Sequence, residues 1–397
     1  MRVLMLHNRY RIRGGEDEST ELEVAMLREA GHEVTLLEAF NDDIGESTGL
    51  VGAAISTIWS RDWERRISDH LAEHQVDVLH VQNFFPLISP SVYRAARLNN
   101  VAVVQSVRNY RLVCPAATLF RDGGFCNDCV SKRWKWPGIV HRCYRGSMAG
   151  SAVVASMAVV HHAMDTWAHS VDRYVAISDY VAERLVEGGF PAAKITVKPN
   201  FVPDMRAGAD FLARAGRPSV LFVGRLTPEK GLDMILSAWH QVQVASDLIV
   251  VGEGERPLSV SRNVQFTGKL PKEEVYVLMR QASMVVMPGS WPEPFGRVAV
   301  EAFAQGTPVI SSDIGGVASI VQHNENGLIF PAGDAQALAT AMNTMLADEA
   351  LRARLGSGAR ASYLAHYTPR ANLHQLEQIY ADAMAQAAIS RAGPRSS

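Results

Sequence analysis

Short apolar segments alternate with helical patterns along most of this 397-residue chain. In the first half we predict strands at residues 3–6, 34–37, 77–81, 101–105, 173–177 and 195–198, and helices at residues 16–30 and 179–188. The second half repeats this alternation, with strands predicted at residues 220–224, 247–252, 264–268, 284–288, 308–311 and 328–330. Strands that alternate with helices form a mostly parallel sheet with helices on both faces. Because the chain exceeds what one core usually organises, the sequence predicts an α/β fold of two Rossmann-like, doubly wound domains.

A proline-punctuated stretch at residues 199–204 separates the two halves and is a plausible hinge. We predict an N-terminal domain at residues 1–199, a linker at 200–217, a C-terminal domain at 218–370, and a final helix with a tail at 371–397. Ligands of open parallel sheets bind beyond the carboxyl ends of the strands. The two domains are therefore expected to face a central cleft.

The charge and the apolar runs limit the classes of partner. A formal net charge of −2 argues against nucleic acid as an obligatory partner. The first residues lead directly into a predicted strand without the pattern of a signal peptide, so we expect a cytoplasmic protein. The longest apolar run, residues 148–160, is shorter than the about 20 residues that span a bilayer. It is a buried or an interfacial helix, and the buried helix is favoured because no basic face accompanies it.

Cations and aromatic rings gather just upstream of this apolar run. They are Lys132, Arg133, Trp134, Lys135, Trp136, Arg142, Tyr144 and Arg145. Such a cluster fits peripheral contact with anionic lipid at the inner membrane face, and it fits a solvated loop equally well.

Two prolines flank Glu293, and each fixes φ and lacks an N–H, so this carboxylate must stand on a loop. After Gly296 the pattern predicts a helix that ends at Gln305-Gly306, with Glu301 just over one turn inside it. The two carboxylates are then on the order of 10 Å apart. We interpret them as the two ends of a site for one extended ligand, which would place a sugar at Glu293, a ribose at Glu301 and phosphates between them near a helix N-terminus.

Arg225 and Lys230 stand on the loop that follows the predicted strand 220–224. Two fixed cations at this place can hold a diphosphate and neutralise the charge that grows on it as it leaves. An ordinary solvated loop is the alternative, and the nearby Glu293–Glu301 stretch favours the functional interpretation.

In the first domain, Gly14 and Gly15 lie between the first predicted strand and the helix that begins at Glu16. Glycines there let backbone N–H groups approach an anion, and the helix dipole favours its charge. The stretch lacks both the Gly-x-Gly-x-x-Gly fingerprint and the Lys-Ser/Thr ending of a P-loop, which disfavours a nicotinamide enzyme and a nucleoside triphosphatase.

Together these motifs resemble the retaining glycosyltransferases of family 4, which have the two-domain GT-B architecture. The resemblance covers nearly the whole chain, including a final helix at about 373–387 that in such enzymes packs back on the first domain. It implies a hexosyl or glycosyltransferase that uses a nucleotide-sugar donor, with an N-terminal acceptor-side domain and a C-terminal donor-binding domain.

The resemblance also implies roles for individual residues. Arg225 and Lys230 would hold the donor diphosphate, Glu301 the ribose, and Glu293 the donor sugar. The donor-binding set would be completed by Gly14, Gly15, Pro294, Phe295, Gly296 and Val298. Such enzymes need no metal or other cofactor for catalysis, and the sequence accordingly lacks an Asp-x-Asp pair. The expected donor is a UDP- or GDP-sugar.

One departure from the family pattern lies at Arg108, where many relatives carry a histidine that faces the donor sugar. Arginine cannot serve as a base at neutral pH, but it can grip a hydroxyl or stabilise an anion. We count Arg108 with Glu293, Arg225 and Lys230 as the catalytic candidates, and Arg108, His80 and Glu16 as acceptor-side candidates. Either the donor geometry differs, or another residue such as His80 or His7 fills the space of the missing histidine. His80 itself is more readily interpreted as a satisfied core residue.

All four cysteines, Cys114, Cys126, Cys129 and Cys143, fall in an insert at residues 110–147. The Cys126-x-x-Cys129 pair has the spacing of half a zinc site, which the outer two could complete. Structural zinc and four free thiols remain equal alternatives. We predict that the insert helps to form the acceptor site.

The sequence therefore predicts transfer of a sugar from a nucleotide-diphosphate donor to a hydroxyl of a glycan or lipid-linked saccharide. Retention and a place in cell-surface polysaccharide or glycoconjugate synthesis are implied by the resemblance alone. The alternatives are a sugar-nucleotide epimerase or phosphorylase of the same fold, and a sugar-nucleotide-binding protein that has lost catalysis, which Arg108 makes conceivable.

Overall fold

The computed structural model describes residues 1–43, 50–206, 217–255, 261 and 263–392. It divides into two compact units. Unit 1 comprises Met1–Leu119, Asn127–Pro199 and Asn372–Ser397, and unit 2 comprises Phe120–Cys126 and Asn200–Ala371. Each unit is built on its own parallel sheet.

Unit 1 contains a six-stranded parallel sheet in the order β2-β1-β3-β4-β7-β8. The strands are β1 (Arg2–Arg9), β2 (Glu33–Phe40), β3 (Val78–Asn83), β4 (Ala102–Val107), β7 (Arg173–Ala176) and β8 (Ile195–Val197). Every residue of β3 and β4 is buried, because helices cover both faces of a parallel sheet.

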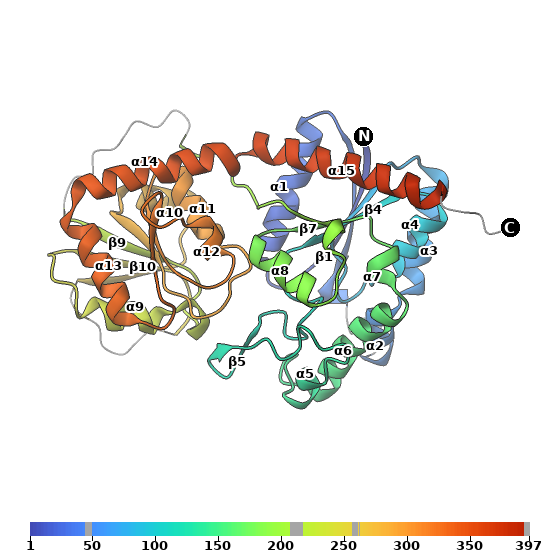
Figure 1. Ribbon diagram of the computed structural model, residues 1–397, viewed down its shortest axis with the longest axis horizontal. Helices are drawn as coiled ribbons and strands as arrows, with labels where there is room; N and C mark the ends of the chain where they lie inside the picture. Colours follow the sequence, from blue (N-terminus) through green and yellow to red (C-terminus); the bar gives the residue numbers. More distant parts are fainter. Residues whose placement is uncertain (44–49, 207–216, 256–260, 262, 393–397) are drawn as a thin grey trace. The chain divides into compact units, whose positions relative to one another are not determined.

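The helices of unit 1 surround this sheet (Figure 1). They are α1 (Gly15–Glu29), α2 (Leu50–Ile58), α3 (Arg61–Glu73), α4 (Ser91–Leu98), α5 (Trp136–Val140), α6 (Met148–Ala163), α7 (Thr166–His169), α8 (Asp179–Glu187) and most of α15 (Pro369–Ala392). Ser60, Ser147 and Ser178 begin α3, α6 and α8, and each hydroxyl oxygen accepts a hydrogen bond from a backbone N–H of the first turn. The N-terminal ends of these three helices are thus determined by residues at the helix start.

Unit 2 contains a second six-stranded parallel sheet, in the order β11-β10-β9-β12-β13-β14. Its strands are β9 (Ser219–Val223), β10 (Asp247–Val251), β11 (Val264–Gly268), β12 (Met284–Met287), β13 (Val309–Ser312) and β14 (Gly327–Phe330). Its helices are α9 (Leu232–Trp239), α10 (Lys272–Gln281), α11 (Arg297–Gln305), α12 (Val317–Ile320), α13 (Ala335–Ala347) and α14 (Glu349–His366). A short antiparallel hairpin, β5 (Phe120–Arg121) and β6 (Gly124–Phe125), is also present.

The core of unit 2 lies between its sheet and helices α9 and α13. Phe222 and Ile310 of the sheet share one buried cluster with Ile235 of α9 and Met342 of α13. Burying each such side chain contributes roughly 1.5–3 kcal/mol relative to leaving it exposed. The apolar runs that predicted the strands therefore hold the helices in place as well.

Both sheets have a topological switch point, where the chain changes the direction in which it adds strands. In unit 1 this point lies between β1 and β3, and in unit 2 it lies between β9 and β12. Ligands of open α/β sheets bind beyond the carboxyl ends of strands at such points.

The predicted α/β fold with two Rossmann-like sheets is confirmed, and each predicted strand is found in one of the two sheets. The hairpin β5–β6 was not predicted, because two-residue strands leave no periodic pattern. The apolar run at 148–160 lies in α6, which buries Val154, Met157 and His161. Among the described residues, no helix has the length and apolar character to cross a membrane.

Gly252 begins the loop after β10 with a φ of +148°, and a Cβ there would overlap the carbonyl oxygen of Gly224. Gly333 also has a positive φ, +87°, but a Cβ there meets no atom within 4 Å. Alanine costs on the order of 1–2 kcal/mol for the backbone conformation at such positions. We expect Gly252→Ala to lower the free energy of unfolding by clearly more than Gly333→Ala, measured by urea denaturation followed by circular dichroism. Equal losses of unfolding free energy in the two variants would show that the loop at Gly252 moves away from Gly224 without a cost in stability.

Candidate active site

A pocket lies at the carboxyl ends of β9, β12 and β13, at the switch point of the unit 2 sheet. It is lined by Phe222, Val223, Lys230, Val286, Met287, Gly289, Trp291, Glu293, Val298, Ser312 and Val317. Most of these residues are apolar, and Lys230 and Glu293 are the two charged side chains on that list. The pocket therefore offers one cation and one carboxylate to a polar ligand.

Lys230 enters the pocket from a 3-10 turn, Pro228–Lys230, that follows β9. The next residue, Gly231, has a φ of +77°, and a Cβ there would overlap the carbonyl oxygen of Pro288. Lys230 Nζ lies 3.0 Å from Glu293 Oε2 and 5.3 Å from the centroid of a Trp291 ring. The turn and the close approach of the Pro288 loop together aim the ammonium group at the pocket.

Glu293 stands on a loop, as the flanking prolines predict. Its backbone N–H donates to the carbonyl of Trp291 at 2.8 Å, and its own carbonyl accepts from the N–H of Gly316 at 2.6 Å. The side chains of Lys230 and Glu293 are each about one-fifth exposed. The pair is thus held by its backbone but remains accessible to a ligand.

Glu301 lies just over one turn into α11, as predicted, after Gly296 starts the helix with a φ of +94°. Its carboxylate pairs with Arg297 at 3.0 Å and with Lys272 at 3.4 Å. Phe295, before Gly296, is buried against the ring of Tyr367. Glu301 is therefore fixed by two cations beside the pocket and does not belong to its lining.

Arg225 differs most from its predicted surroundings. Its side chain is 72% exposed and lies 3.4 Å from Glu229 on the same loop. Of the predicted donor-binding set in unit 2, Lys230, Glu293 and Val298 share the pocket, while Arg225 and Glu301 are not part of its lining. The short stretch that carries Pro294, Phe295 and Gly296 joins the pocket to α11.

Trp291, which begins the stretch around Glu293, was not among the predicted site residues. Trp291 lines the pocket, and its indole Nε1 is buried without a hydrogen-bond partner in the part of the chain that the structure describes. A buried donor of this kind costs free energy unless a ligand satisfies it. The sequence signal that could have indicated its role is an aromatic residue two positions before a carboxylate on a loop.

In unit 1, Glu23 of α1 is the centre of a buried charge network. Its carboxylate lies 2.6 Å from Lys198 Nζ, just after β8, and 2.9 Å from Arg108 Nη2, just after β4. Gln82 of β3 accepts from Arg108, and Asn372 of α15 accepts from Lys198. The network around Glu23 therefore ties five elements of unit 1 together, α1, β3, β4, β8 and α15.

The electrostatics of this network favour the charged carboxylate. Burial raises the pKa of Glu23, but Lys198 and Arg108 outweigh it and hold the pKa well below its ordinary range. Burial lowers the pKa of Lys198, and although Glu23 raises it, the neighbouring charge of Arg108 lowers it further. A network with two cations and one carboxylate is stable only while the carboxylate remains ionised.

His80 is a core residue. It is fully buried, with Nδ1 2.7 Å from the Tyr380 hydroxyl and Nε2 2.9 Å from the Ser106 hydroxyl. Burial lowers the pKa of His80 to about 3, so the ring is neutral. The core interpretation of His80 is the one that these contacts support.

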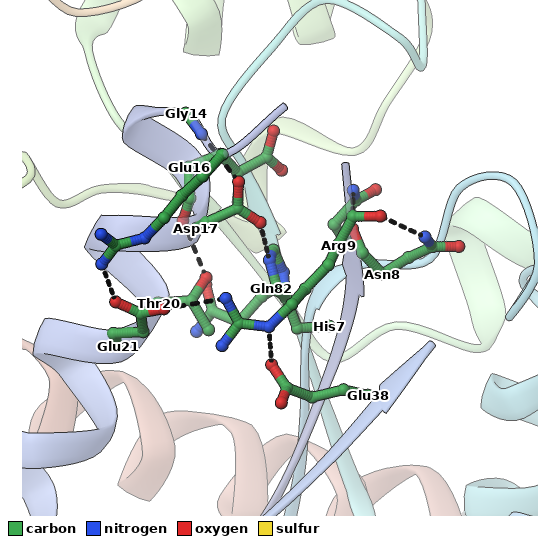
Figure 2. A network of polar contacts seen from close by, with 12 residues as sticks. His7, Asn8, Arg9, Gly14, Glu16, Asp17, Thr20, Glu21, Glu38 and Gln82 are labelled. Atoms are coloured by element: carbon green, nitrogen blue, oxygen red, sulfur yellow. Dashed lines mark hydrogen bonds and ion pairs between the residues drawn. The ribbon is translucent and has the colours of Figure 1, made fainter. Parts of the chain in front are cut away.

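His7 is held by Asp17, which also ties down the start of α1. His7 Nε2 lies 2.8 Å from Asp17 Oδ1, while Asp17 Oδ2 accepts from the N–H of Gly14 at 2.9 Å. Figure 2 shows Asp17 between these two groups. Gly14 precedes Gly15, the first residue of α1, so the predicted glycine pair does stand at a helix N-terminus.

A second pocket in unit 1 lies beyond β3 and β4 and includes two of the acceptor-side candidates, Glu16 and Arg108. Asn109 donates to Glu16 at 3.3 Å, and burial raises the pKa of Glu16. His80 is not part of this lining. Arg108 reaches the pocket while Glu23 and Gln82 hold its guanidinium, so it is a fixed group there.

The structure gives no support to zinc, one of the two alternatives left open for the four cysteines. None of Cys114, Cys126, Cys129 and Cys143 forms a disulfide, and the described residues contain no group of three or more His, Cys, Asp or Glu side chains placed to hold a metal. Instead, the buried Lys135 ammonium donates to the carbonyls of Cys129 and Val130. The spacing of cysteines indicates which thiols are near in sequence but not which way they point.

Two family models match the chain. The model described as "Glycosyl transferase 4-like domain" matches residues 14–200, and the model described as "Glycosyl transferases group 1" matches residues 209–362. The two matches do not overlap, and together they include the candidate residues of both units.

Among curated proteins, the chain is similar to an uncharacterized 42.6 kDa protein in the cps region of Klebsiella pneumoniae, with 25% identity over 364 residues, 80% of this chain and 86% of that protein. It is also similar to the phosphatidyl-myo-inositol mannosyltransferase of Mycobacterium leprae, with 32% identity over 222 residues, 52% of this chain and 58% of that protein. Among solved structures it is similar to the Anabaena protein HepE in complex with UDP, with a TM-score of 0.66 at 18% identity, covering 96% of this chain and all of that one. At this identity the structural likeness shows the fold alone.

We expect Glu23→Gln to lower the free energy of unfolding by about 3–5 kcal/mol near neutral pH, because it leaves two buried cations without an anion. Because the folded pKa of Glu23 is depressed, its contribution is present above the ordinary carboxyl range and is lost as the pH falls toward the folded pKa. The difference between the variant and the unsubstituted protein should therefore shrink in acid. Urea denaturation at a series of pH values measures it.

Glu21→Gln is the matched control, since Glu21 lies on the same helix and pairs with Arg9 at the surface. A surface ion pair contributes roughly 0–1 kcal/mol. A loss of equal size in both variants would contradict the central place of Glu23.

Proposed function

Because this chain is a nucleotide-sugar glycosyltransferase of GT-B fold and family 4 type, we propose that it transfers a sugar, with retention, to a hydroxyl of a glycan or lipid-linked saccharide. The observation that carries the proposal is the Lys230–Glu293 pair, 3.0 Å apart, in a pocket at the switch point of the unit 2 sheet. A cation suits a diphosphate, and a carboxylate suits the hydroxyls of a sugar.

Lys230 supplies the charge that the chemistry needs. The bond between the anomeric carbon and the donor phosphate oxygen breaks, and negative charge develops on the departing nucleoside diphosphate. A fixed ammonium at this place stabilises that charge without reorganisation. Arg225, exposed on the same loop, is proposed as a second cation that closes on the diphosphate.

The acceptor hydroxyl oxygen attacks the anomeric carbon from the face that the phosphate leaves, and its proton passes to the departing phosphate oxygen. This same-face displacement retains the anomeric configuration and needs no side-chain nucleophile. Glu293 orients the donor sugar through its hydroxyls, and Glu301 holds the ribose. No metal or other cofactor is needed in this scheme, because the protein's own cations neutralise the leaving group.

The donor is proposed to be a UDP- or GDP-sugar, and the similarity to a protein crystallised with UDP supports the first of these. Glu16 and Arg108, which line one pocket in unit 1, are proposed to contact the acceptor. Synthesis of a cell-surface polysaccharide or glycoconjugate is supported by the similarity to a protein of a cps region. Cytoplasmic residence with peripheral contact at the inner membrane face completes the proposal.

We expect Lys230→Ala and Glu293→Ala each to reduce sugar transfer by about 10²–10³-fold, the effect of removing one group that stabilises developing charge. The measurement is release of nucleoside diphosphate from a panel of UDP- and GDP-sugars in the presence of glycan acceptors. Release that does not depend on an acceptor would favour an epimerase, a phosphorylase or hydrolysis instead. Nucleotide binding without any turnover would favour a binding protein.

Glu274→Ala is the control for these variants, because Glu274 is an exposed residue of α10 outside the pocket. Circular dichroism and thermal denaturation establish that each variant is folded. Near-normal transfer by both pocket variants would overturn the proposed site.

Trp291→Phe keeps an aromatic ring beside Lys230 but removes the unpartnered indole N–H. We expect it to weaken binding of UDP or GDP by about three- to tenfold, the value of one hydrogen bond. Trp291→Ala, which also removes the ring, should weaken binding further. Isothermal titration calorimetry measures both. Trp63→Phe is the matched control, because the ring of Trp63 also lies under a cation, Arg66, but on α3.

A further inference from the structure

The segment between Asp128 and Asp165 has an unusual charge. It contains five Lys and Arg residues and no Asp or Glu, in a chain whose formal net charge is −2. The five cations are Lys132, Arg133, Lys135, Arg142 and Arg145. Positive charge is therefore concentrated in one part of unit 1.

Within this segment the usual order of burial is reversed. Lys135 is buried, with a φ of 40°, and its ammonium donates to the carbonyls of Cys129 and Val130 at 2.7 and 3.0 Å. Its two neighbours, Trp134 and Trp136, are 68% and 54% exposed. Lysine is among the residues least often buried, and exposed tryptophan leaves a large apolar area in water. The backbone is thus built to hold the cation inside and to present both indoles outward.

The exposed residues of this segment belong to one folded piece. Helix α5 packs against α6, and Figure 1 shows the two side by side. The N–H of Cys143 donates to the carbonyl of Gly138, and the N–H of Tyr144 donates to the hydroxyl of Ser151 in α6. The chain from Trp136 to the first turns of α6 is therefore folded back on itself.

We call these exposed residues the basic-aromatic surface. It consists of Lys132, Arg133, Trp134, Trp136, Val140, Arg142, Arg145 and Met148. Lys132 Nζ lies 5.2 Å from the centroid of a Trp136 ring, so cation and indole are neighbours within it. Val140 and Met148 are 57% and 51% exposed and extend the apolar part.

We propose that the basic-aromatic surface docks on an anionic membrane surface. Tryptophan prefers the boundary between headgroups and acyl chains, where its ring is in an apolar layer and its N–H stays wet. Lys and Arg beside it attract anionic headgroups, and the absence of Asp and Glu from the segment removes repulsion between protein and lipid. The proposal rests on the lipid-linked acceptor of the proposed function, because docking would bring unit 1 to the layer in which such an acceptor resides.

The test uses the full chain and vesicles of phosphatidylcholine, with and without phosphatidylglycerol, in a co-sedimentation assay. We expect binding to vesicles with phosphatidylglycerol, little binding to phosphatidylcholine alone, and weaker binding as salt rises. Trp134→Ala/Trp136→Ala and Lys132→Glu/Arg133→Glu should each weaken binding by about tenfold or more. Tryptophan emission should shift to the blue when vesicles are added, and the shift should be reduced in the double alanine variant.

Arg61→Glu/Arg65→Glu is the matched control, because both residues are exposed on α3 and the substitution changes the net charge by the same amount. Loss of binding in this control as large as in Lys132→Glu/Arg133→Glu, or unchanged binding by the double alanine variant, would overturn the proposal. The proposal would also be overturned if the protein bound polyglutamate as well as it binds vesicles and the double alanine variant bound polyglutamate equally well. That result would indicate a general site for polyanions.

UDP and GDP binding in solution, measured by calorimetry, separates this inference from the proposed function. The surface variants should bind nucleotide as the unsubstituted protein does, since no residue of the basic-aromatic surface lines the unit 2 pocket. If the protein binds nucleotide but not vesicles, the membrane-docking proposal is refuted and the proposed function is not. If the protein binds vesicles but neither binds nucleotide nor transfers sugar, the proposed function is refuted and the docking proposal is not.

Discussion

A parallel sheet requires that every connection return to the edge from which its strand started, and this requirement organises both units. The loops after successive strands meet at one edge, and the switch points leave room there for a ligand. In unit 2 this edge brings together Lys230, which follows β9, and Glu293, which follows β12. The same rule in unit 1 brings the start of α1 beside Gln82 of β3 and Arg108 after β4.

The two units treat charge in different ways. In the unit 2 pocket, Lys230 and Glu293 pair but stay partly exposed, so a polar ligand can replace water around them. In unit 1, Glu23 of α1 and its two cations are almost fully buried, and the network extends to β3, β4, β8 and α15. The exposed pair is suited to binding, whereas the buried network fixes how the elements of unit 1 meet and holds Arg108 in place.

The distribution of charge is as informative as its total. The net charge of −2 argues against nucleic acid as an obligatory partner. Yet one segment of unit 1 that lacks Asp and Glu carries five cations beside two exposed indoles. The proposed donor pocket and the proposed docking surface would together suit an enzyme whose donor is dissolved and whose acceptor is held in a membrane. Within that segment, the buried Lys135 ammonium is bonded to backbone carbonyls, while its neighbours Trp134 and Trp136 are exposed.

The sequence alone determined what depends on neighbouring residues. Apolar runs located the strands, two prolines placed Glu293 on a loop, and the pattern after Gly296 placed Glu301 one turn into a helix. Tertiary structure alone decided which side chains meet. It paired Arg108 with Glu23, placed Lys230 beside Glu293 and left the four cysteines outside any metal-binding group in the described chain. These outcomes depend on strand order and on contacts between residues distant in the chain, which local periodicity and spacing do not encode.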